Sequence, residues 1–230
     1  MELSIDTAGD VASVALSQEG RLLAELTWNA RRNHSAELLP AIDTLLRQQG
    51  ADRTALTAVF VNRGPGGYAG LRVGMSTAMA LAYGLGLPVV GVGRLEADAY
   101  QHAAFPGPVC AVHRAGRGEL AWAAYQWDGE AERELVPPRL GTPEAVAREA
   151  PPGALFCGEV TPELAAALRA ARGPETRLIT GAGAVRRAGF LAELAWRRLA
   201  AGGGLEPGAL EPIYLREPAA APPEARAAES

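Results

Sequence analysis

The residues whose types and spacing best suit chemistry form a glycine-rich turn at positions 63–74. An apolar run at 58–62 predicts a buried strand before the turn, and small residues at 69–85 predict a helix after it. A bare turn at the start of a helix exposes backbone N–H groups at the positive end of the helix dipole, where a phosphate can bind. The same spacing is also typical of a plain strand-to-helix connection in an α/β protein, so the turn alone does not identify a function.

Other side-chain chemistries are limited by the composition. All 22 basic residues are arginine, which excludes a Walker-type phosphate loop and a Schiff-base lysine. None of the three histidines, His34, His102 and His113, has a second histidine at the spacing of a helical metal site. A Gly-x-Ser-x-Gly nucleophile turn is absent from the sequence. We therefore expect no metal site and no catalytic residue.

The overall composition indicates a globular chain. Its 230 residues, 48% of them hydrophobic, suffice for one large or two small domains, and a net charge of −4 argues against a free-standing nucleic-acid binder. Cys110 and Cys157 each lie singly in an apolar run, which favours buried thiols in a reducing compartment. No cleavable leader is apparent after Met1, and glycines interrupt the longest uncharged stretch, 73–93. We expect a cytoplasmic protein without a membrane segment.

Hydrophobic periodicity and turn residues predict the same order of strands and helices in each half of the chain. Strands at 3–6, 12–16 and 21–28 precede a helix at 34–49 with Asn33 as its N-cap, and the strand at 58–62, the helix at 69–85, a strand at 89–92 and a helix at 95–102 follow. After a linker at 105–108 come strands at 109–112, 119–127, 133–136, 155–157 and 177–179, helices that open at 142 and 161, and a last helix at 185–200. The pattern divides the chain into a first lobe (1–104), a reduced second lobe (105–184), a terminal helix and segment that packs back on the body (185–216) and a disordered tail (217–230).

The two predicted helices at 34–49 and 69–85 in the first lobe carry more apolar residues than packing on one sheet requires. Packing on the sheet explains part of this pattern, and the remainder predicts an exposed interface. Because methionines adapt to different surfaces, either a similar partner or a second copy of the chain could bind there, and we expect a homodimer when no partner is present. The residues expected at this interface are His34, Leu38, Ile42, Leu71, Arg72, Met75 and Met79.

Four stretches together resemble the TsaB (YeaZ) family, within the superfamily of actin, Hsp70 and sugar kinases. They are Ile5-Asp6-Thr7 with the strand at 12–16, the helix start at 34–40, the glycine turn at 64–74 and the terminal segment at 212–216. The glycine turn departs from the family pattern of Ser, Phe and Thr at Gly67, Tyr68 and Ala69. Since two hydroxyl groups are lost, a ligand could be held there only by backbone groups.

The resemblance implies an actin-like α/β fold of two lobes, each built on a β-β-β-α-β-α unit, with little of the related enzyme's chemistry. It implies a non-catalytic subunit that binds a TsaD-like catalytic subunit and supports threonylcarbamoyl transfer to the adenosine beside the tRNA anticodon. A TsaE-like ATPase would be a further partner, and tRNA would be contacted indirectly. No cofactor is certain, although ATP or ADP with Mg²⁺ could bind at a complex interface.

Alternatives remain open at this stage. By analogy with related kinases, Asp6, Thr7, Gly64 and Gly66 are candidate phosphate-binding residues, so an independent ATPase or small-molecule kinase of the same fold is the main rival. A glycoprotease-like peptidase is a third reading. Three arginine doublets, at 31–32, 186–187 and 197–198, could touch tRNA phosphates, but on an acidic chain they favour solvated faces.

Overall fold

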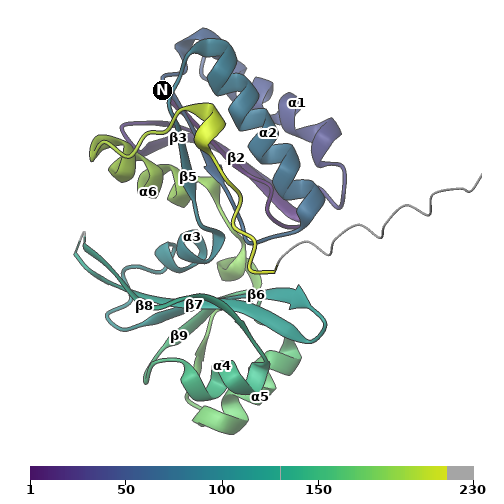
Figure 1. The fold of residues 1–230 in the computed structure, drawn as a ribbon, viewed down its shortest axis with the longest axis vertical. Helices are drawn as coiled ribbons and strands as arrows, with labels where there is room; N and C mark the ends of the chain where they lie inside the picture. Colours follow the sequence, from purple (N-terminus) through teal and green to yellow (C-terminus); the bar gives the residue numbers. More distant parts are fainter. Residues whose placement is uncertain (130, 217–230) are drawn as a thin grey trace, which may run out of the picture.

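The computed structural model describes residues 1–129 and 131–216, so the tail expected to be disordered lies outside the described residues. Within them the chain forms two lobes, each with one five-stranded mixed sheet, stacked along the long axis of the molecule (Figure 1). The connection between the lobes includes a short helix, α3 (Arg94–Tyr100), which lies at their junction.

The first sheet has the strand order β3-β2-β1-β4-β5. Strand β1 pairs antiparallel with β2 and parallel with β4, which leaves β3 and β5 at the edges. Its strands are β1 (Glu2–Asp6), β2 (Val11–Gln18), β3 (Arg21–Asn29), β4 (Ala58–Asn62) and β5 (Val89–Val92). Helices α1 (His34–Gln48) and α2 (Tyr68–Leu85) lie side by side and bury their apolar faces against this sheet. The predicted β-β-β-α-β-α order is therefore confirmed for this lobe.

The second sheet repeats this topology in the order β10-β9-β6-β7-β8. Its strands are β6 (Val109–Gly116), β7 (Glu119–Asp128), β8 (Ala131–Gly141), β9 (Leu155–Gly158) and β10 (Arg177–Leu178). Helices α4 (Pro143–Glu149) and α5 (Pro162–Arg172) begin as the sequence indicates, because the hydroxyls of Thr142 and Thr161 accept hydrogen bonds from the N–H groups of Ala145 and Leu164. The repeat of element order is thus confirmed in three dimensions.

Two helices are exchanged between the lobes: each follows a strand of one lobe and packs on the sheet of the other. Helix α3 follows β5 but packs on β6, β7 and β9, whereas α6 (Ala188–Ala200) follows β10 and packs on β1 to β5. A shared apolar cluster joins the lobes at this exchange, and Phe60, Leu95, Tyr125 and Leu191 belong to it. The exchange therefore ties each lobe to the other through a helix as well as through the chain connection.

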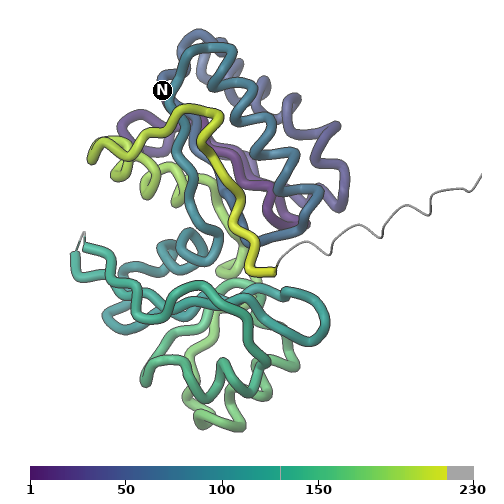
Figure 2. The backbone as a smooth tube through the Cα atoms, viewed as in Figure 1, coloured from purple at the N-terminus to yellow at the C-terminus, as the bar shows by residue number. Residues whose placement is uncertain are grey.

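The C-terminal segment runs from the first lobe toward the second (Figure 2). Leu205 bridges Val89 on the edge strand β5, and the Ile213 N–H donates to the Arg63 carbonyl at 2.7 Å. Arg216 then forms an ion pair with Glu119 of β7. The segment therefore contacts both lobes.

Some predicted boundaries are wrong for identifiable reasons. The last helix begins at Ala188 rather than at 185, because the backbone at Val185 and Arg187 is extended and a short 3₁₀ helix (Gly181–Ala184) precedes it. Strand β8 extends past the predicted 133–136 through Pro137 and Pro138, which an edge strand tolerates because one row of its N–H groups needs no partner. Asn33 precedes α1 as predicted, but its side chain makes no capping hydrogen bond.

The uncharged stretch at 73–93 divides between α2, a turn and β5, as the glycines predict. Among the described residues, no helix combines the length and apolar character needed to cross a membrane.

Candidate functional site at the lobe junction

The glycine-rich turn after β4 packs tightly against the end of β1. A methyl group added at Gly66 would lie 2.2 Å from the Ala8 carbonyl oxygen, so only glycine fits there. The Gly67 N–H donates to that same carbonyl at 3.1 Å, and Gly64 has a positive φ of 97°. These glycines therefore serve the close approach of two backbone segments.

The first turns of α2 lie equally close to Thr7. The Thr7 hydroxyl donates to the Gly70 carbonyl at 2.7 Å, and a Cβ atom at Gly74 would lie 2.2 Å from the Thr7 Oγ1 atom. Gly70 and Gly74 of α2 are therefore covered by the residue that follows β1 in the same chain. The turn sets where this helix begins relative to the sheet.

The Asp6 carboxylate at the end of β1 is fully surrounded by donors. It accepts from the Ala8 N–H at 3.0 Å, from Asn62 Nδ2 at 2.9 Å, and from Arg186 Nε and Nη2 at 3.0 and 3.1 Å. Burial by itself would raise the pKa of Asp6, but the charge and hydrogen bonds of Arg186 and the other donors lower it below its usual value. Asp6 is therefore ionised and neutralised internally.

The four candidate phosphate-binding residues lie close together, and polar groups of three of them are already engaged within the chain. Asp6 is paired with Arg186, the Thr7 hydroxyl is bonded to Gly70, and the Gly64 N–H donates to Asn62 Oδ1 at 2.9 Å. A phosphate would have to displace these contacts. In the described arrangement, the charged and hydroxyl groups at the end of β1 are therefore bonded within the chain.

A second arginine spans the two lobes beside this junction. Arg94, fully buried at the start of α3, donates to the Ala8 carbonyl of the first lobe at 3.2 Å and to Glu159 of the second at 2.7 Å. Glu159 also lies 3.1 Å from His113 Nδ1. Burial opposes ionisation of Glu159, but contact with His113 and the Arg94 charge hold its pKa far below the usual value. Asp98 on α3 completes the cluster, 3.5 Å from Arg94 Nε and 3.8 Å from Arg186 Nε.

Sequence reasoning missed Arg94, Asp98, Glu159 and Arg186 as members of one cluster. The expectation that the doublet at 186–187 touches solvent or RNA is wrong for Arg186, which is bound to Asp6, and Arg187 pairs with Glu25 at 2.7 Å. In the doublet at 197–198, Arg197 pairs with Glu193 and Arg198 with Glu96. No local signal marks this pairing, because Asp6 and Arg186 lie 180 positions apart in the chain.

The predicted interface needs correction, because most of its residues lie in the core of the first lobe. Leu38, Ile42, Leu71 and Met75 are at most 5% exposed and pack between the two helices and the sheet. His34 is also buried, and its Nε2 atom lies 2.9 Å from the Gly9 carbonyl oxygen. These five side chains cannot form a surface for a partner while the lobe keeps this packing. Periodicity identified an apolar face correctly, but that face meets the sheet.

The outer faces of the same helices carry different residues. Arg72 is exposed, with its guanidinium 4.6 Å from the Tyr68 ring centroid, and Met79 is half-buried. Tyr68 stacks on Tyr214 of the C-terminal segment, with 6.1 Å between the ring centroids. Leu39, Tyr68 and Tyr83 are 55%, 53% and 84% exposed and were missing from the predicted interface.

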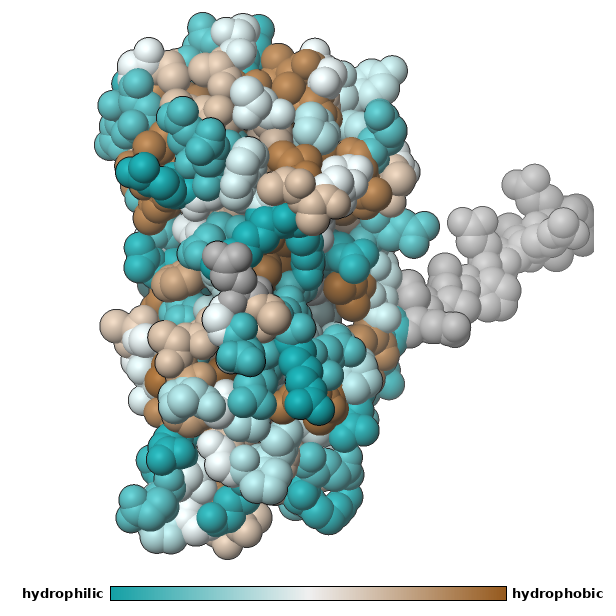
Figure 3. Space-filling view, turned by 90° about the vertical axis from the view of Figure 1, so that its left-hand side faces the viewer, coloured by the Kyte–Doolittle hydropathy of each residue, from teal (hydrophilic) through white to brown (hydrophobic). Residues whose placement is uncertain are grey.

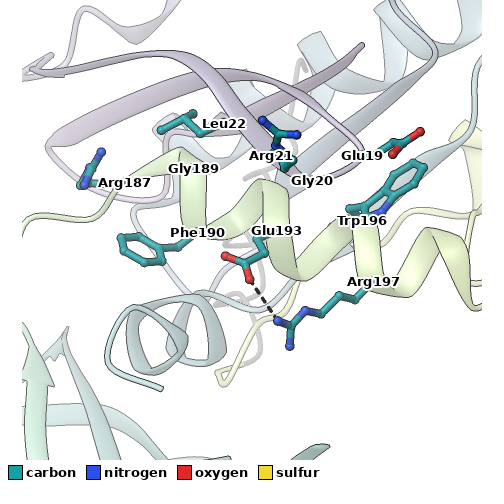
Figure 4. A pocket seen from close by; sticks show the side chains of 10 residues that line it. All are labelled: Glu19, Gly20, Arg21, Leu22, Arg187, Gly189, Phe190, Glu193, Trp196 and Arg197. Carbon is teal, nitrogen blue, oxygen red and sulfur yellow. Dashed lines mark hydrogen bonds and ion pairs between the residues drawn. The ribbon is translucent and has the colours of Figure 1, made fainter. Parts of the chain in front are cut away.

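Two sizeable pockets lie outside the charged junction. One, of about 590 Å³, lies between the β2–β3 turn and α6, where Leu22, Phe190 and Trp196 form its apolar wall (Figure 4). Two of the three arginines that line it have acidic partners: Arg197 faces Glu193, as the dashed line shows, and Arg187 binds Glu25. The other, of about 560 Å³, lies where α1 and α2 begin, beside the glycine turn. Its lining includes Thr7, Gly67 and Gly70 as well as Arg32, His34 and Tyr68.

The described residues contain no group of three or more His, Cys, Asp or Glu side chains arranged to hold a metal ion. Both cysteines are buried and free.

The doubled β-β-β-α-β-α topology and the junction between its halves define a protein of the actin-like ATPase fold. A hexokinase of the ROK class from Thermus thermophilus shares this fold, with a TM-score of 0.50 and 15% identity over 87% of this chain and 99% of that one. The predicted fold class is therefore confirmed.

Comparisons at higher similarity give the family. A sequence model described as TsaD, tRNA N6-adenosine threonylcarbamoyltransferase, matches residues 23–167. The crystal structure of YeaZ from Pseudomonas aeruginosa superposes with a TM-score of 0.78 and 29% identity, covering 93% of this chain and 99% of that one. The chain belongs to the TsaB (YeaZ) family.

Two curated relatives carry the family name "tRNA threonylcarbamoyladenosine biosynthesis protein TsaB". The protein from Bacillus subtilis (strain 168) is 32% identical over 135 residues, which are 59% of each chain. The protein from Escherichia coli (strain K12) is 34% identical over 146 residues, which are 60% of this chain and 63% of that one. The chain thus matches about three fifths of the length of these relatives.

Proposed function

We propose that this chain is a non-catalytic subunit that supports a TsaD-like enzyme in transferring a threonylcarbamoyl group to the adenosine next to the tRNA anticodon. Membership of the TsaB family and the names of its bacterial relatives support this function. The observation that carries the non-catalytic role is the pairing of Arg186 with Asp6, which fills the place where a kinase of this fold would need an open acid. The independent ATPase or kinase and the peptidase are not favoured.

We place the partner contact on the outer faces of α1 and α2. Exposed Leu39, Arg72 and Tyr83 support this placement, with half-buried Met79 beside them. Tyrosine and arginine are frequent at energetically important positions of interfaces. On the side of the molecule seen in Figure 3, apolar side chains lie in groups among hydrophilic ones. The same α1–α2 face would form a homodimer when the chain is alone.

Further elements of the proposal concern ligands and location. Any ATP or ADP with Mg²⁺ would bind at the contact with the partner, because the polar groups around Asp6 are used within this chain. A TsaE-like ATPase would join the complex, tRNA would be contacted through the catalytic subunit, and the complex would act in the cytoplasm.

Reconstitution of the modification tests the function. The TsaD-like enzyme of the same organism, its TsaE-like ATPase, tRNA and the donor of the threonylcarbamoyl group are combined with and without this chain, and modified adenosine is measured. We expect modification to fall at least about tenfold when the chain is omitted. Equal modification without it would reject the proposal, as would turnover of ATP by the chain alone at the rate of the full complex.

Two charge-introducing variants test the contact surface. Leu39→Glu and Tyr83→Glu should abolish co-purification with the TsaD-like enzyme, since each places a charge on the proposed contact. Leu22→Glu is the matched control, because Leu22 is 44% exposed and its side chain lies beside Gly189 of α6. Unchanged binding by both test variants would move the contact elsewhere while leaving the reconstitution result intact.

A further inference from the structure

The two helices exchanged between the lobes each bring one arginine to the lobe junction. Arg94 stands at the start of α3, and Arg186 lies in the extended segment just before α6. Their side chains are almost fully buried, at 1% and 10% exposure. Three buried or half-buried carboxylates face them: Asp6, Asp98 and Glu159. With every group ionised, these five residues carry two positive and three negative charges, and the exposed guanidinium of Arg114 lies 3.5 Å from Glu159 at the rim of the cluster.

The hydrogen bonds of the cluster are shared unequally among the three acids. Asp6 accepts four from Arg186, Asn62 and Ala8, and Glu159 accepts from Arg94 Nη2 and from the Arg114 N–H. Neither oxygen of Asp98 has a hydrogen-bond partner, although its side chain is only 2% exposed. A buried carboxylate without donors is costly to keep ionised, so Asp98 is the acid of the cluster that takes up a proton most easily.

The groups that face Asp98 come from every element around it. Arg94 lies on its own helix and Arg186 before α6, while Asp6 ends β1 and Glu159 follows β9. Cys157 on β9 donates its thiol to the Asp98 carbonyl at 3.5 Å, and burial keeps that thiol neutral by raising its pKa. His113 on β6 touches Glu159, and burial together with the Arg94 charge lowers its pKa, so it adds no charge near neutral pH.

We propose that Asp98 is the proton-binding member of a latch between the two lobes, formed by Asp6, Arg94, Asp98, Glu159 and Arg186. When Asp98 is ionised, it competes with Asp6 and Glu159 for the two arginines and weakens the contact. When Asp98 is protonated, the charges of the five residues sum to zero, and Asp6 keeps Arg186 while Glu159 keeps Arg94. Uptake of one proton therefore tightens the lobe junction, with no ligand required.

Direct titration tests the first half of this proposal. The ¹³C chemical shift of the Asp98 carboxyl is followed by NMR from pH 4 to pH 8, and Asp98→Asn identifies the resonance. Burial raises the pKa of Asp98 to about 6, against the partly offsetting charges of Arg94 and Arg186, and we expect a midpoint there. A midpoint below pH 4.5 would overturn the proposal.

Hydrogen exchange tests the coupling to the lobes. The reporter is the Arg94 amide, which donates to the Gly64 carbonyl at 2.7 Å and so joins α3 to the first lobe. Asp98→Asn removes the titration of Asp98. His113 is present in both proteins, so its own protonation on opening, which changes the protection factor with pH in the opposite direction, cancels in their ratio. For a pKa near 6, the ratio of the variant's protection factor to that of the unaltered chain should rise about fourfold from pH 5.5 to pH 7.5.

The matched control is Asp128→Asn, at an exposed aspartate at the end of β7. The ratio of its Arg94 protection factor to that of the unaltered chain should stay constant over the same pH range. A ratio for Asp98→Asn that also stays constant would show that the proton on Asp98 does not act on the lobe contact. Since both measurements use the chain alone, their outcome is independent of any partner complex.

Discussion

The Arg186 guanidinium binds both carboxylate oxygens of Asp6, at 3.0 and 3.1 Å, although the two residues lie 180 positions apart in the chain. The pair closes the junction between a strand end of the first lobe and the segment that returns from the second lobe. Arg186 supplies within the chain the positive charge that the buried Asp6 carboxylate needs in order to stay ionised.

Removing this arginine should be strongly destabilising. Arg186→Gln leaves Asp6 and Asp98 buried with less compensation, and loss of one partner of a buried ion pair costs about 3–5 kcal/mol. Urea unfolding followed by circular dichroism measures the change. Arg47→Gln is the control, because Arg47 and its partner Asp43 are both exposed, and surface pairs contribute about 0–1 kcal/mol. Equal losses in the two variants would mean that Arg186 is not needed for the junction.

The glycine turn should tolerate no side chain at its closest approach. Gly66→Ala would place a methyl group 2.2 Å from the Ala8 carbonyl oxygen, so we expect a loss of roughly 1–3 kcal/mol as the backbone shifts. Gly84→Ala, in α2 with open space around it, should instead stabilise by about 0.5–1 kcal/mol. Thermal unfolding of the two variants compares the signs. Similar positive shifts for both would contradict the close packing of the turn.

Acid should weaken the junction through Asp6. Because the folded-state pKa of Asp6 is lowered, its contribution to stability is present above the unfolded pKa of about 4 and is lost as the pH falls through the folded value. The free energy of unfolding should therefore decrease below pH 4. In Asp6→Asn this decrease should be smaller, whereas Asp43→Asn, at an exposed site, should leave it unchanged. A variant profile parallel to that of the unaltered chain would argue against an ionised, paired Asp6.

Both thiols should be unreactive in the folded chain. Burial raises the pKa of Cys110 to about 12 and that of Cys157 well above its ordinary value, and neither side chain is exposed. Since the thiolate is the reactive form, labelling with iodoacetamide at pH 8 should be at least about a hundredfold slower in the native chain than in urea. Rapid labelling of the native protein would mean that the lobes open readily.

Several features follow from local sequence. Strand and helix order could be predicted because apolar periodicity, glycine stops and N-terminal threonines act within a few residues. Thr142 and Thr161 cap α4 and α5 as their positions indicate, and the glycine turn at 64–67 lies where expected, after β4. The motifs that carry the family resemblance are equally local. The repeated order of strands and helices gives the fold class, because such an order can pack in only a few ways.

Only the tertiary structure decides what each apolar face and each charge meets. Periodicity marks Leu38, Ile42, Leu71 and Met75 as one face of two helices, but it cannot tell a sheet from a partner, and here the sheet buries them. Charge patterns likewise cannot show that Arg186 returns across 180 residues to Asp6. Local patterns therefore predicted the order of the elements, and the motifs indicated the family. The Asp6–Arg186 pair and the outer faces of α1 and α2 depend on long-range packing, since burial and ion pairing are properties of residues that meet only after folding.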